Sequence, residues 1–386
     1  MRIGIPKEIL PNENRVAATP ETVARLLALG FEVVVEKDAG AGILAGDAPY
    51  RQAGAGICDT VEDLYARSDI VLKVKQPIFN ERLRRSEAEM LRPECTLITF
   101  LHPAAPGSHA VVRRLAERRI TAFTMDSVPR TPRAQKMDAL TSMSTITGYK
   151  AVLMAANLMP RFVPMLATAI GTVKPARILV IGTGVVGLQA VATAKRLGGL
   201  VTCVDIRPEA REEAKSLGAK IAGFDVPPEL AKGPGGYARA LPEAWLLQER
   251  QHLAPLLEEC DIALLSALVP GEQAPVLITP EMVGRMRAGS VVVDVSVDQG
   301  GNCSATKPGA ITDHSHVTVF GVQNIPGSVA QHASWLYANN LVHFIENMFK
   351  RGPESIDFDD EIVQATLVTR GGEIVHAGAR KAMGLR

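Results

Sequence analysis

Short apolar runs rich in β-branched residues alternate with amphipathic segments along the whole chain. Toward its N-terminus, the apolar runs that predict strands lie at residues 2–5, 31–35, 69–74, 96–101 and 120–123. Helical spacing of apolar positions appears between them, as at 110–117, and Thr19 before Pro20 is typical of a helix start. Strands separated by helices in this way favour a parallel sheet.

A second series of the same kind begins near residue 176. Its predicted strands are residues 177–181, 201–204, 262–265 and 291–295, and its predicted helices are 185–197 and 209–217. Two long, apolar, helix-prone segments, 148–159 and 329–349, are placed to connect the two series. We therefore predict an α/β fold of two Rossmann-like parallel-sheet domains joined by long helices. The first domain is discontinuous, 1–140 plus 330–386, around a second domain at 141–329.

Two shorter segments carry turn signals. The apolar runs 363–369 and 374–376 flank Gly371 and Gly372, which predicts a β-hairpin near the end of the chain. Residues 225–236 (DVPPELAKGPGG) are rich in Pro and Gly, so we expect a mobile linker there.

Composition and charge narrow the class of protein. The 386 residues are 47% apolar and 22% charged, ordinary values for a globular chain. Lys and Arg number 42 and Asp and Glu 41, so the net charge of +1 gives no strong attraction to nucleic acid. The five cysteines lie far apart without a C-x-x-C pair, and we expect neither a disulfide framework nor a metal site.

No segment predicts direct insertion into a membrane. The uncharged apolar run 178–194 contains three glycines and is shorter than the roughly 20 apolar residues that a span requires. Lys7 and Glu8 follow the first residues so closely that the apolar core of a signal peptide does not fit. These observations predict a cytoplasmic protein.

The segment GTGVVG at residues 182–187 fits the pattern G-x-G-x-x-G. It follows the apolar strand RILVI and opens a predicted helix. In such a unit the first glycine permits the tight turn, the second lets the backbone approach a pyrophosphate, and the third lets helix and strand pack closely. The helix N-terminus adds free N–H groups and the positive end of its dipole. A tight turn in a sheet that binds no ligand is the other explanation.

An acidic residue at the end of the next strand bears on the choice of nucleotide. Asp205 lies 23 positions after Gly182. It would accept hydrogen bonds from an adenosine ribose and repel a 2′-phosphate, which favours NAD(H). Arg207, two positions on, weakens this preference because an arginine there can accommodate a 2′-phosphate.

A polar segment at residues 126–143 precedes the first connecting helix. It carries Arg130, Arg133, Gln135, Asp138, Thr141 and Ser142. One interpretation is structural, with Asp138 or Thr141 capping the helix and the arginines in solvent. The other places the segment beside a cleft between the lobes, where an arginine, a carboxamide and a carboxylate fix a nicotinamide and its ribose without proton chemistry.

These motifs together resemble a known family. The stretches GTGVVGLQA, PRTPRAQKMDALTSM, ALVPGEQAPVLIT and GSVVVDVSVDQGGNC are similar to the NAD(H)-binding component of proton-translocating nicotinamide nucleotide transhydrogenase. The R-A-Q-x-x-D loop is the most specific piece, because it separates transhydrogenases from the related alanine dehydrogenases. The resemblance implies direct hydride transfer between NAD(H) on this chain and NADP(H) on a partner subunit, coupled to proton translocation by membrane subunits.

The resemblance also implies roles for individual residues. The candidate catalytic residues are Gln135, which would reach toward the partner's nucleotide, and Arg130 and Asp138, which with Thr141 would hold the nicotinamide end of NAD(H). The residues expected to bind the cofactor elsewhere are Gly182, Gly184, Val185, Gly187, Asp205, Arg207, Gly236, Tyr237 and Leu268. Of these, Gly236 and Tyr237 match the family's mobile Gly-Gly-Tyr loop.

Partners and location follow from the same resemblance. It implies a homodimer that associates with membrane-spanning and NADP-binding transhydrogenase subunits. The chain would then be cytoplasmic and peripherally attached to the inner membrane through those subunits.

Four residues match a different enzyme, although the first of them, Arg15, is shared by both families and does not discriminate between them. Arg15, Lys75, His102 and Asp298 match the residues with which alanine dehydrogenases bind the substrate carboxylate and move a proton. Oxidative deamination needs such a base, because an amine must lose a proton as the hydride leaves, whereas transfer between two nicotinamides needs none. An NAD-dependent alanine or other amino-acid dehydrogenase is therefore one alternative. A non-catalytic NAD-binding sensor is another.

Overall fold

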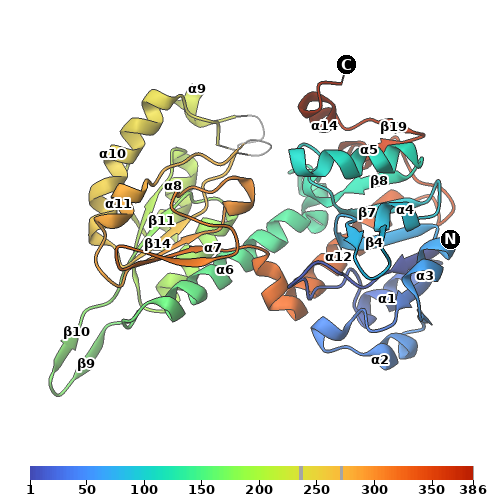
Figure 1. Cartoon of the computed structure of the whole chain (residues 1–386), viewed down its shortest axis with the longest axis horizontal. Helices are drawn as coiled ribbons and strands as arrows, with labels where there is room; N and C mark the ends of the chain where they lie inside the picture. The colour runs from blue at the N-terminus through green and yellow to red at the C-terminus, as the bar shows by residue number, and fades with distance from the viewer. Residues whose placement is uncertain (234–237, 270–272, 386) are drawn as a thin grey trace. The chain divides into compact units, whose positions relative to one another are not determined.

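The computed structural model of the chain describes residues 1–233, 238–269 and 273–385. The chain divides into two compact units, each built around its own sheet (Figure 1). The first unit comprises Met1–Met143 and Pro326–Arg386, and the second comprises Ser144–Ile325.

The first unit contains an eight-stranded sheet. Its strands are β1 (Arg2–Ile5), β2 (Glu32–Glu36), β3 (Gly56–Cys58), β4 (Ile70–Lys75), β7 (Thr96–Phe100), β8 (Thr121–Thr124), β18 (Leu367–Arg370) and β19 (Glu373–Ile374). They lie in the order β19-β18-β8-β7-β4-β1-β2-β3. Strands from β8 to β3 pair in parallel, and β18 and β19 pair antiparallel with their neighbours.

Helices and short turns complete the first unit. The helices are α1 (Pro20–Ala28), α2 (Asp47–Gln52), α3 (Val61–Arg67), α4 (Glu87–Met90), α5 (His109–Glu117), α12 (Ala330–Met348), α13 (Glu361–Thr366) and α14 (Ala377–Ala382), with a small β5 (Phe79–Asn80) and β6 (Arg85–Ser86) pair. The predicted start of α1 is confirmed: Thr19 is the N-cap and Pro20 is the first helical residue.

The second unit contains a seven-stranded sheet. Its strands are β11 (Arg177–Ile181), β12 (Leu200–Val204), β13 (Lys220–Ile221), β14 (Ile262–Leu265), β15 (Val291–Asp294), β16 (Ile311–His314) and β17 (Val317–Gly321). The order is β13-β12-β11-β14-β15-β17-β16, and all neighbours pair in parallel except β16 with β17. Its helices are α7 (Val185–Arg196), α8 (Pro208–Ser216), α9 (Pro228–Ala231), α10 (Glu243–Glu259) and α11 (Pro280–Gly284), together with most of α6 (Ala139–Leu158), whose first turn belongs to the first unit.

Both sheets are doubly wound, which confirms the predicted fold class. In the second sheet the strand order reverses between β11 and β14, and in the first sheet it reverses between β1 and β4. Open α/β sheets bind ligands outside the carboxyl ends of the strands at such a reversal. The residues that follow these four strands are therefore candidates for ligand binding.

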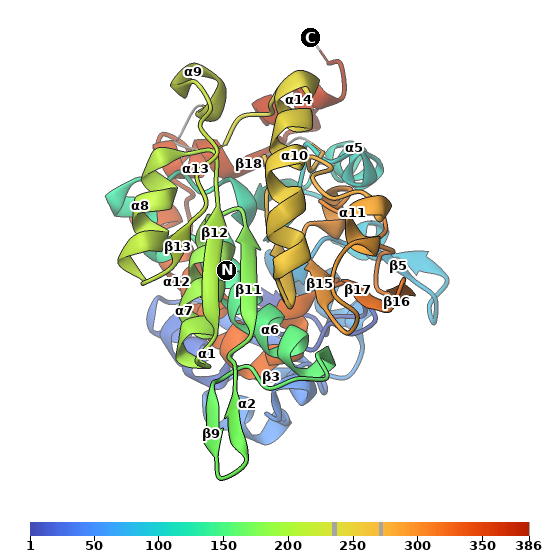
Figure 2. The same cartoon turned by 90° about the vertical axis from the view of Figure 1, so that its left-hand side faces the viewer.

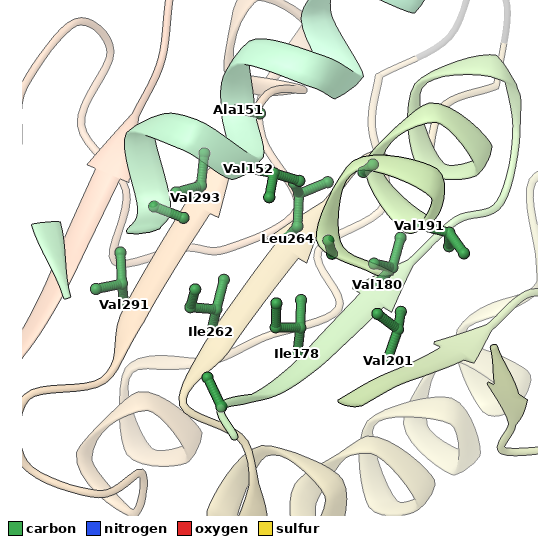
Figure 3. Packing of buried hydrophobic residues seen from close by; sticks show 14 of the residues in the cluster. Ala151, Val152, Ile178, Val180, Val191, Val201, Ile262, Leu264, Val291 and Val293 are labelled. Carbon is green, nitrogen blue, oxygen red and sulfur yellow. The ribbon is translucent and has the colours of Figure 1, made fainter. Parts of the chain in front are cut away.

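Alternating residues of the second sheet face two separate cores. Ile178 and Val180 of β11 pack beneath α6 and α7 (Figure 3), whereas Leu179 and Ile181 face α10 and α11. Gly148 lets α6 approach α7 closely, because a Cβ there would overlap the carbonyl oxygen of Val186. A sheet covered on both faces explains why its strands read as continuous apolar runs.

Several elements differ from the prediction. The predicted hairpin at Gly371 and Gly372 is confirmed as β18 and β19, but the prediction of a strand from 363 was wrong, since residues 361–366 form α13. The Pro/Gly-rich stretch contains the short helix α9, and its residues 234–236 lie outside the described part. A hairpin of β9 (Leu166–Thr168) and β10 (Gly171–Val173) was not predicted and extends beyond the second sheet (Figures 1 and 2).

Within the described residues, none of the helices has the length and apolar character needed to cross a membrane.

Candidate functional site

The glycine turn lies at the carboxyl end of β11, beside the point where the strand order reverses. Gly182 has a φ of +85°, and a Cβ there would lie 2.8 Å from the main-chain nitrogen of Ala267. A Cβ on Gly187 would overlap the carbonyl oxygen of Gly182. The first and third glycines are therefore required by backbone conformation and by close packing.

The second glycine faces open space. Gly184 has an extended backbone with φ −74°, and the nearest atom to a Cβ there would be Nη2 of Arg207, at 4.0 Å. Gly184 is also the N-cap of α7, and no side chain among the described residues caps this helix. Free N–H groups at the start of α7, next to half-buried Val185, fit the pyrophosphate of a dinucleotide.

Asp205 lies at the end of β12, and both of its carboxylate oxygens accept hydrogen bonds within the protein. Oδ2 accepts from the main-chain N–H of Thr183 at 2.7 Å, and this bond fixes the glycine turn. Arg207 donates from Nε to Oδ1 at 3.0 Å and from Nη2 to Oδ2 at 2.9 Å. Burial acts to lower the pKa of Arg207, but the hydrogen bonds and charge of Asp205 outweigh it and raise the pKa.

The loop that follows β14 forms the other side of the glycine turn. Ser266 donates from Oγ to the carbonyl of Gly182 at 2.8 Å. Asn302 holds the loop through the main chain of Ala267, with hydrogen bonds of 2.8 and 3.0 Å. Asp294 in turn accepts the N–H of Asn302 at 2.8 Å. Asn302 and Asp294 belong to the quoted run GSVVVDVSVDQGGNC, but sequence reasoning did not identify their role.

Three further residues are expected to bind the cofactor, and one of them lies in the described part of the chain. Leu268 is half-buried in the loop after β14. Gly236 and Tyr237 lie outside the described residues.

A buried carboxyl group lies within electrostatic range of Asp205. Glu249 on α10 is buried, and among the described residues no hydrogen bond reaches its carboxylate. The pKa of Glu249 is raised to about 7, mainly by burial and secondly by the negative charge of Asp205. Sequence reasoning missed Glu249, because nothing in the pattern of α10 separates it from its solvated glutamates.

The R-A-Q segment of the first unit forms the 3-10 helix η4 (Pro132–Met137). Arg130 and Gln135 are exposed, and among the described residues the Gln135 side chain makes no hydrogen bond. Asp138 caps α6, because its Oδ1 accepts the N–H of Thr141 at 2.8 Å and its Oδ2 accepts the Thr141 hydroxyl at 2.6 Å. The structural role expected for Asp138 is confirmed, and the cap also fixes the end of the segment.

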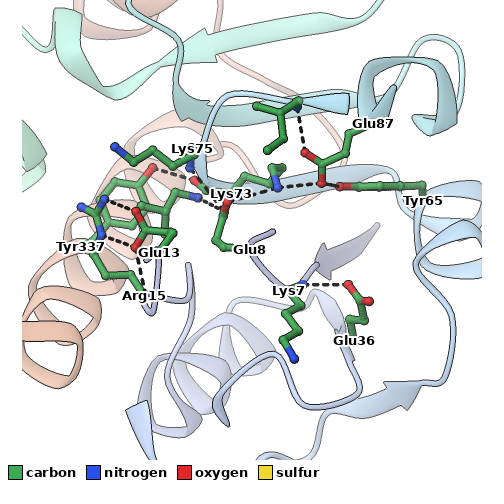
Figure 4. A network of polar contacts seen from close by, with 12 residues as sticks. Lys7, Glu8, Glu13, Arg15, Glu36, Tyr65, Lys73, Lys75, Glu87 and Tyr337 are labelled. Atoms are coloured by element: carbon green, nitrogen blue, oxygen red, sulfur yellow. Dashed lines mark hydrogen bonds and ion pairs between the residues drawn. The ribbon is translucent and has the colours of Figure 1, made fainter. Parts of the chain in front are cut away.

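Of the candidate dehydrogenase residues in the first unit, Arg15 follows β1, Lys75 ends β4 and His102 follows β7. The strand order reverses between β1 and β4. Arg15 is buried and donates from Nε and Nη2 to the two carboxylate oxygens of Glu13, at 2.7 and 2.5 Å (Figure 4). Burial alone would raise the pKa of Glu13, but the hydrogen bonds and charge of Arg15 lower it, and Lys75 adds to this effect. Arg15 is thus already neutralised by an internal carboxylate.

A fully buried ionic network lies next to this pair. Lys73 is 3.3 Å from Oε2 of Glu8 and 2.9 Å from Oε1 of Glu87, which also accepts the Tyr65 hydroxyl (Figure 4). Burial acts to lower the pKa of Lys73, but the two carboxylates raise it. Glu8 also accepts the main-chain N–H of Lys75, so the network fixes the end of β4.

His102 pairs with a largely buried aspartate, Asp126. Its Nδ1 lies 3.3 Å from Oδ2 of Asp126, its side chain is half exposed, and its φ of +46° is unusual for a residue with a Cβ. Burial would raise the pKa of Asp126, but His102 and Thr124 lower it. Asp298 lies in the second unit, exposed, where its Oδ1 accepts from Nε2 of Gln323 at 2.7 Å.

Comparisons with known proteins cover nearly the whole chain. The family models "Alanine dehydrogenase/PNT, N-terminal domain" and "Alanine dehydrogenase/PNT, C-terminal domain" match residues 4–147 and 151–377. In Rhodospirillum rubrum, the chain named as the first part of NAD(P) transhydrogenase subunit alpha is 42% identical over 379 residues, which are 97% of this chain and 98% of that protein. An alanine dehydrogenase of Halomonas elongata is 31% identical over 392 residues, covering 100% of this chain and 97% of its own length.

Solved structures of a transhydrogenase and of an L-alanine dehydrogenase also match this chain over nearly its whole length. The crystal structure of transhydrogenase from Sinorhizobium meliloti matches with a TM-score of 0.84 at 38% identity, covering 97% of this chain and 100% of that one. An L-alanine dehydrogenase structure matches with a TM-score of 0.81 at 27% identity, covering 100% of this chain and 99% of that one.

Proposed function

This chain belongs to the alanine dehydrogenase/PNT family, and from that premise we propose that it is the NAD(H)-binding component of a proton-translocating transhydrogenase. Its higher identity to transhydrogenase alpha subunits than to alanine dehydrogenases supports this choice within the family. The observation that carries the proposal is Gln135, an exposed, uncharged carboxamide on a segment that resembles the R-A-Q-x-x-D loop.

We assign the pyrophosphate and adenosine end of NAD(H) to the second unit. The open face of Gly184 and the start of α7 would hold the pyrophosphate, and Asp205 with Arg207 would meet the ribose. We assign the nicotinamide end, as the resemblance implies, to Arg130, with Asp138 and Thr141 as the capped end of the same segment. When bound, the nicotinamide itself donates or accepts the hydride.

The residues of this chain would act by positioning rather than by proton transfer. A hydride passes between two nicotinamides only when their reacting carbons lie about 3–3.5 Å apart. A carboxamide such as Gln135 can align such a pair by hydrogen bonds without titrating. In this proposal the NADP(H)-binding component and the proton-translocating membrane subunits are separate chains, and the present chain attaches to the membrane through them as a homodimer.

One observation favours the dehydrogenase alternative. The His102 imidazole is half exposed and paired with the largely buried Asp126, an arrangement that suits a general base. The neutralisation of Arg15 by Glu13 argues against it, because a substrate carboxylate would have to compete with an internal one.

A reconstituted assay separates the possibilities. The purified chain, mixed with an NADP(H)-binding transhydrogenase component, should oxidise NADH with NADP⁺, and neither protein should do so alone. L-alanine with NAD⁺ should give no reaction with this chain. Turnover of L-alanine by the isolated chain would instead establish the dehydrogenase, and NADH binding without either reaction would establish the sensor.

A further inference from the structure

Contacts on both sides of Gln135 hold η4 in place. Ala134 and Met137 are buried, so two apolar side chains anchor this short helix. Asn340 of α12 donates from Nδ2 to the main-chain carbonyl of Lys136 at 2.8 Å. Gln135 therefore projects from a fixed backbone although its own side chain is exposed.

Arg133 provides the charged anchor of the same helix. Its Nη1 donates to Oδ2 of Asp360 at 2.7 Å and to Oδ1 of Asn347 at 2.9 Å. Its Nη2 donates to Oε1 of Glu361 at 3.0 Å. One planar guanidinium thus connects η4 to the last turn of α12 and the start of α13, a geometry that a lysine ammonium cannot reproduce.

Asp360 is itself rigidly held, so it can serve as a fixed point. Its side chain is 3% exposed, and its Oδ1 caps α13 by accepting the N–H groups of Ile362 and Val363. Burial would raise the pKa of Asp360, but the hydrogen bonds from Arg133, Asn347 and the main chain hold it well below its usual range. Asp360 therefore stays ionised and paired at all physiological pH values.

We propose that Arg133 is a positioning residue for hydride transfer, which fixes Gln135 by tying η4 to Asp360. The inference rests on the proposed function of the chain. It gives the two arginines of the segment separate roles. Arg130 would bind the nucleotide, and Arg133 would hold η4 in place.

The test compares Arg133→Gln with Arg133→Lys in the reconstituted assay. At saturating nucleotides the hydride-transfer rate of Arg133→Gln should fall at least tenfold while the dissociation constant for NADH stays within twofold of wild type. Arg133→Lys should recover part of the rate. Asp360→Asn, which keeps an oxygen to cap α13, should reduce the rate by less than twofold when added to Arg133→Gln, because both changes break the same link.

Arg114→Gln is the matched control. Arg114 on α5 is also half exposed and pairs with two carboxylates, those of Glu89 and Glu117. Arg114→Gln should change neither the hydride-transfer rate nor the affinity for NADH. Hydrogen exchange supplies a readout besides activity, since the amides of residues 134–138 should exchange faster in Arg133→Gln and at the wild-type rate in Arg114→Gln.

The outcomes separate the two proposals. An active wild type with an Arg133→Gln rate within twofold, or with NADH affinity lost in parallel with rate, overturns the positioning role alone. A wild type that transfers no hydride with the NADP(H)-binding component overturns the proposed function and this inference with it.

Discussion

The Arg207 guanidinium covers the Asp205 carboxylate, with Nε 3.0 Å from Oδ1 and Nη2 2.9 Å from Oδ2. The residue expected to recognise the ribose is therefore already paired with the residue that could recognise a 2′-phosphate. A ribose hydroxyl can reach Asp205 only in competition with Arg207, and a 2′-phosphate would meet Arg207 only in competition with Asp205. In the proposed NAD(H) site, the balance within this one ion pair would therefore decide between the two nucleotides.

Removing each partner should shift nucleotide preference in opposite directions. Asp205→Asn keeps an oxygen for Thr183 but removes the charge that repels a 2′-phosphate, so NADH binding should weaken roughly tenfold and NADPH binding should strengthen. Arg207→Ala frees the carboxylate, so the preference for NADH should widen. Titration of both nucleotides into each variant measures this. A shift in the same direction for both variants would show that the pair does not select the nucleotide.

The glycines of the turn should separate folding from binding. In Gly187→Ala the new methyl overlaps the carbonyl of Gly182, so unfolding free energy should fall by about 1–3 kcal/mol. Gly184→Ala should fold normally, because its φ of −74° suits any residue, yet lose at least tenfold in NADH affinity as the methyl fills the place of the pyrophosphate. Denaturant titration measures the stability of both variants, and NADH titration measures their affinity. Normal NADH affinity in Gly184→Ala would remove the pyrophosphate from this turn.

Local signals explain which parts of the fold were predictable. The glycine turn, the Thr19 cap and the buried strands of the second sheet depend on short-range pattern, and the structure has them where the sequence predicts. The stretch from residue 363 also has the composition of a strand. It is helical because Asp360, three positions earlier, caps it.

The charge pairs of the site could not be predicted in the same way. The link between Arg133 and Asp360 joins residues more than 200 positions apart, so only the fold brings them together. Arg207 on Asp205 and Arg15 on Glu13 are sequence neighbours, but a spacing of two does not reveal whether the arginine turns inward or toward solvent.

Glu249 should make stability depend on pH near neutrality. Its pKa is raised to about 7 in the folded chain by burial and by Asp205, against about 4.3 when unfolded, so the folded state holds the proton more tightly. Stability should therefore decrease as pH rises from about 4.5 to 7 and then level off. Glu249→Gln should match wild type near pH 4.5 and exceed it by about 3 kcal/mol at pH 8.5. Denaturant unfolding at both pH values measures this, with exposed Glu243→Gln on the same helix as control. Equal gains at both pH values would exclude titration of Glu249 as the cause.

His102 should be dispensable for transfer between nucleotides. His102→Asn removes the imidazole beside Asp126 while an asparagine tolerates the positive φ at this position. The reconstituted rate should stay within twofold of wild type, because no proton moves in that reaction. The same variant tested with L-alanine and NAD⁺ is the decisive comparison: alanine turnover in the wild type that disappears in His102→Asn would replace the transhydrogenase proposal with the dehydrogenase.

Gln135 should matter for the rate of hydride transfer and little for NADH binding. Its carboxamide is exposed and has no hydrogen bond among the described residues, so shortening it to asparagine disturbs no internal contact. A contact that aligns the two nicotinamides is made in the transition state, and losing it lowers the rate without changing ground-state affinity. Gln135→Asn should therefore reduce the reconstituted rate well over tenfold with an NADH dissociation constant within twofold of wild type. Lys136→Gln, exposed on the same turn, is the control and should leave both unchanged. Loss of NADH affinity in Gln135→Asn would place this side chain on the NAD(H) of its own chain rather than toward the partner's nucleotide.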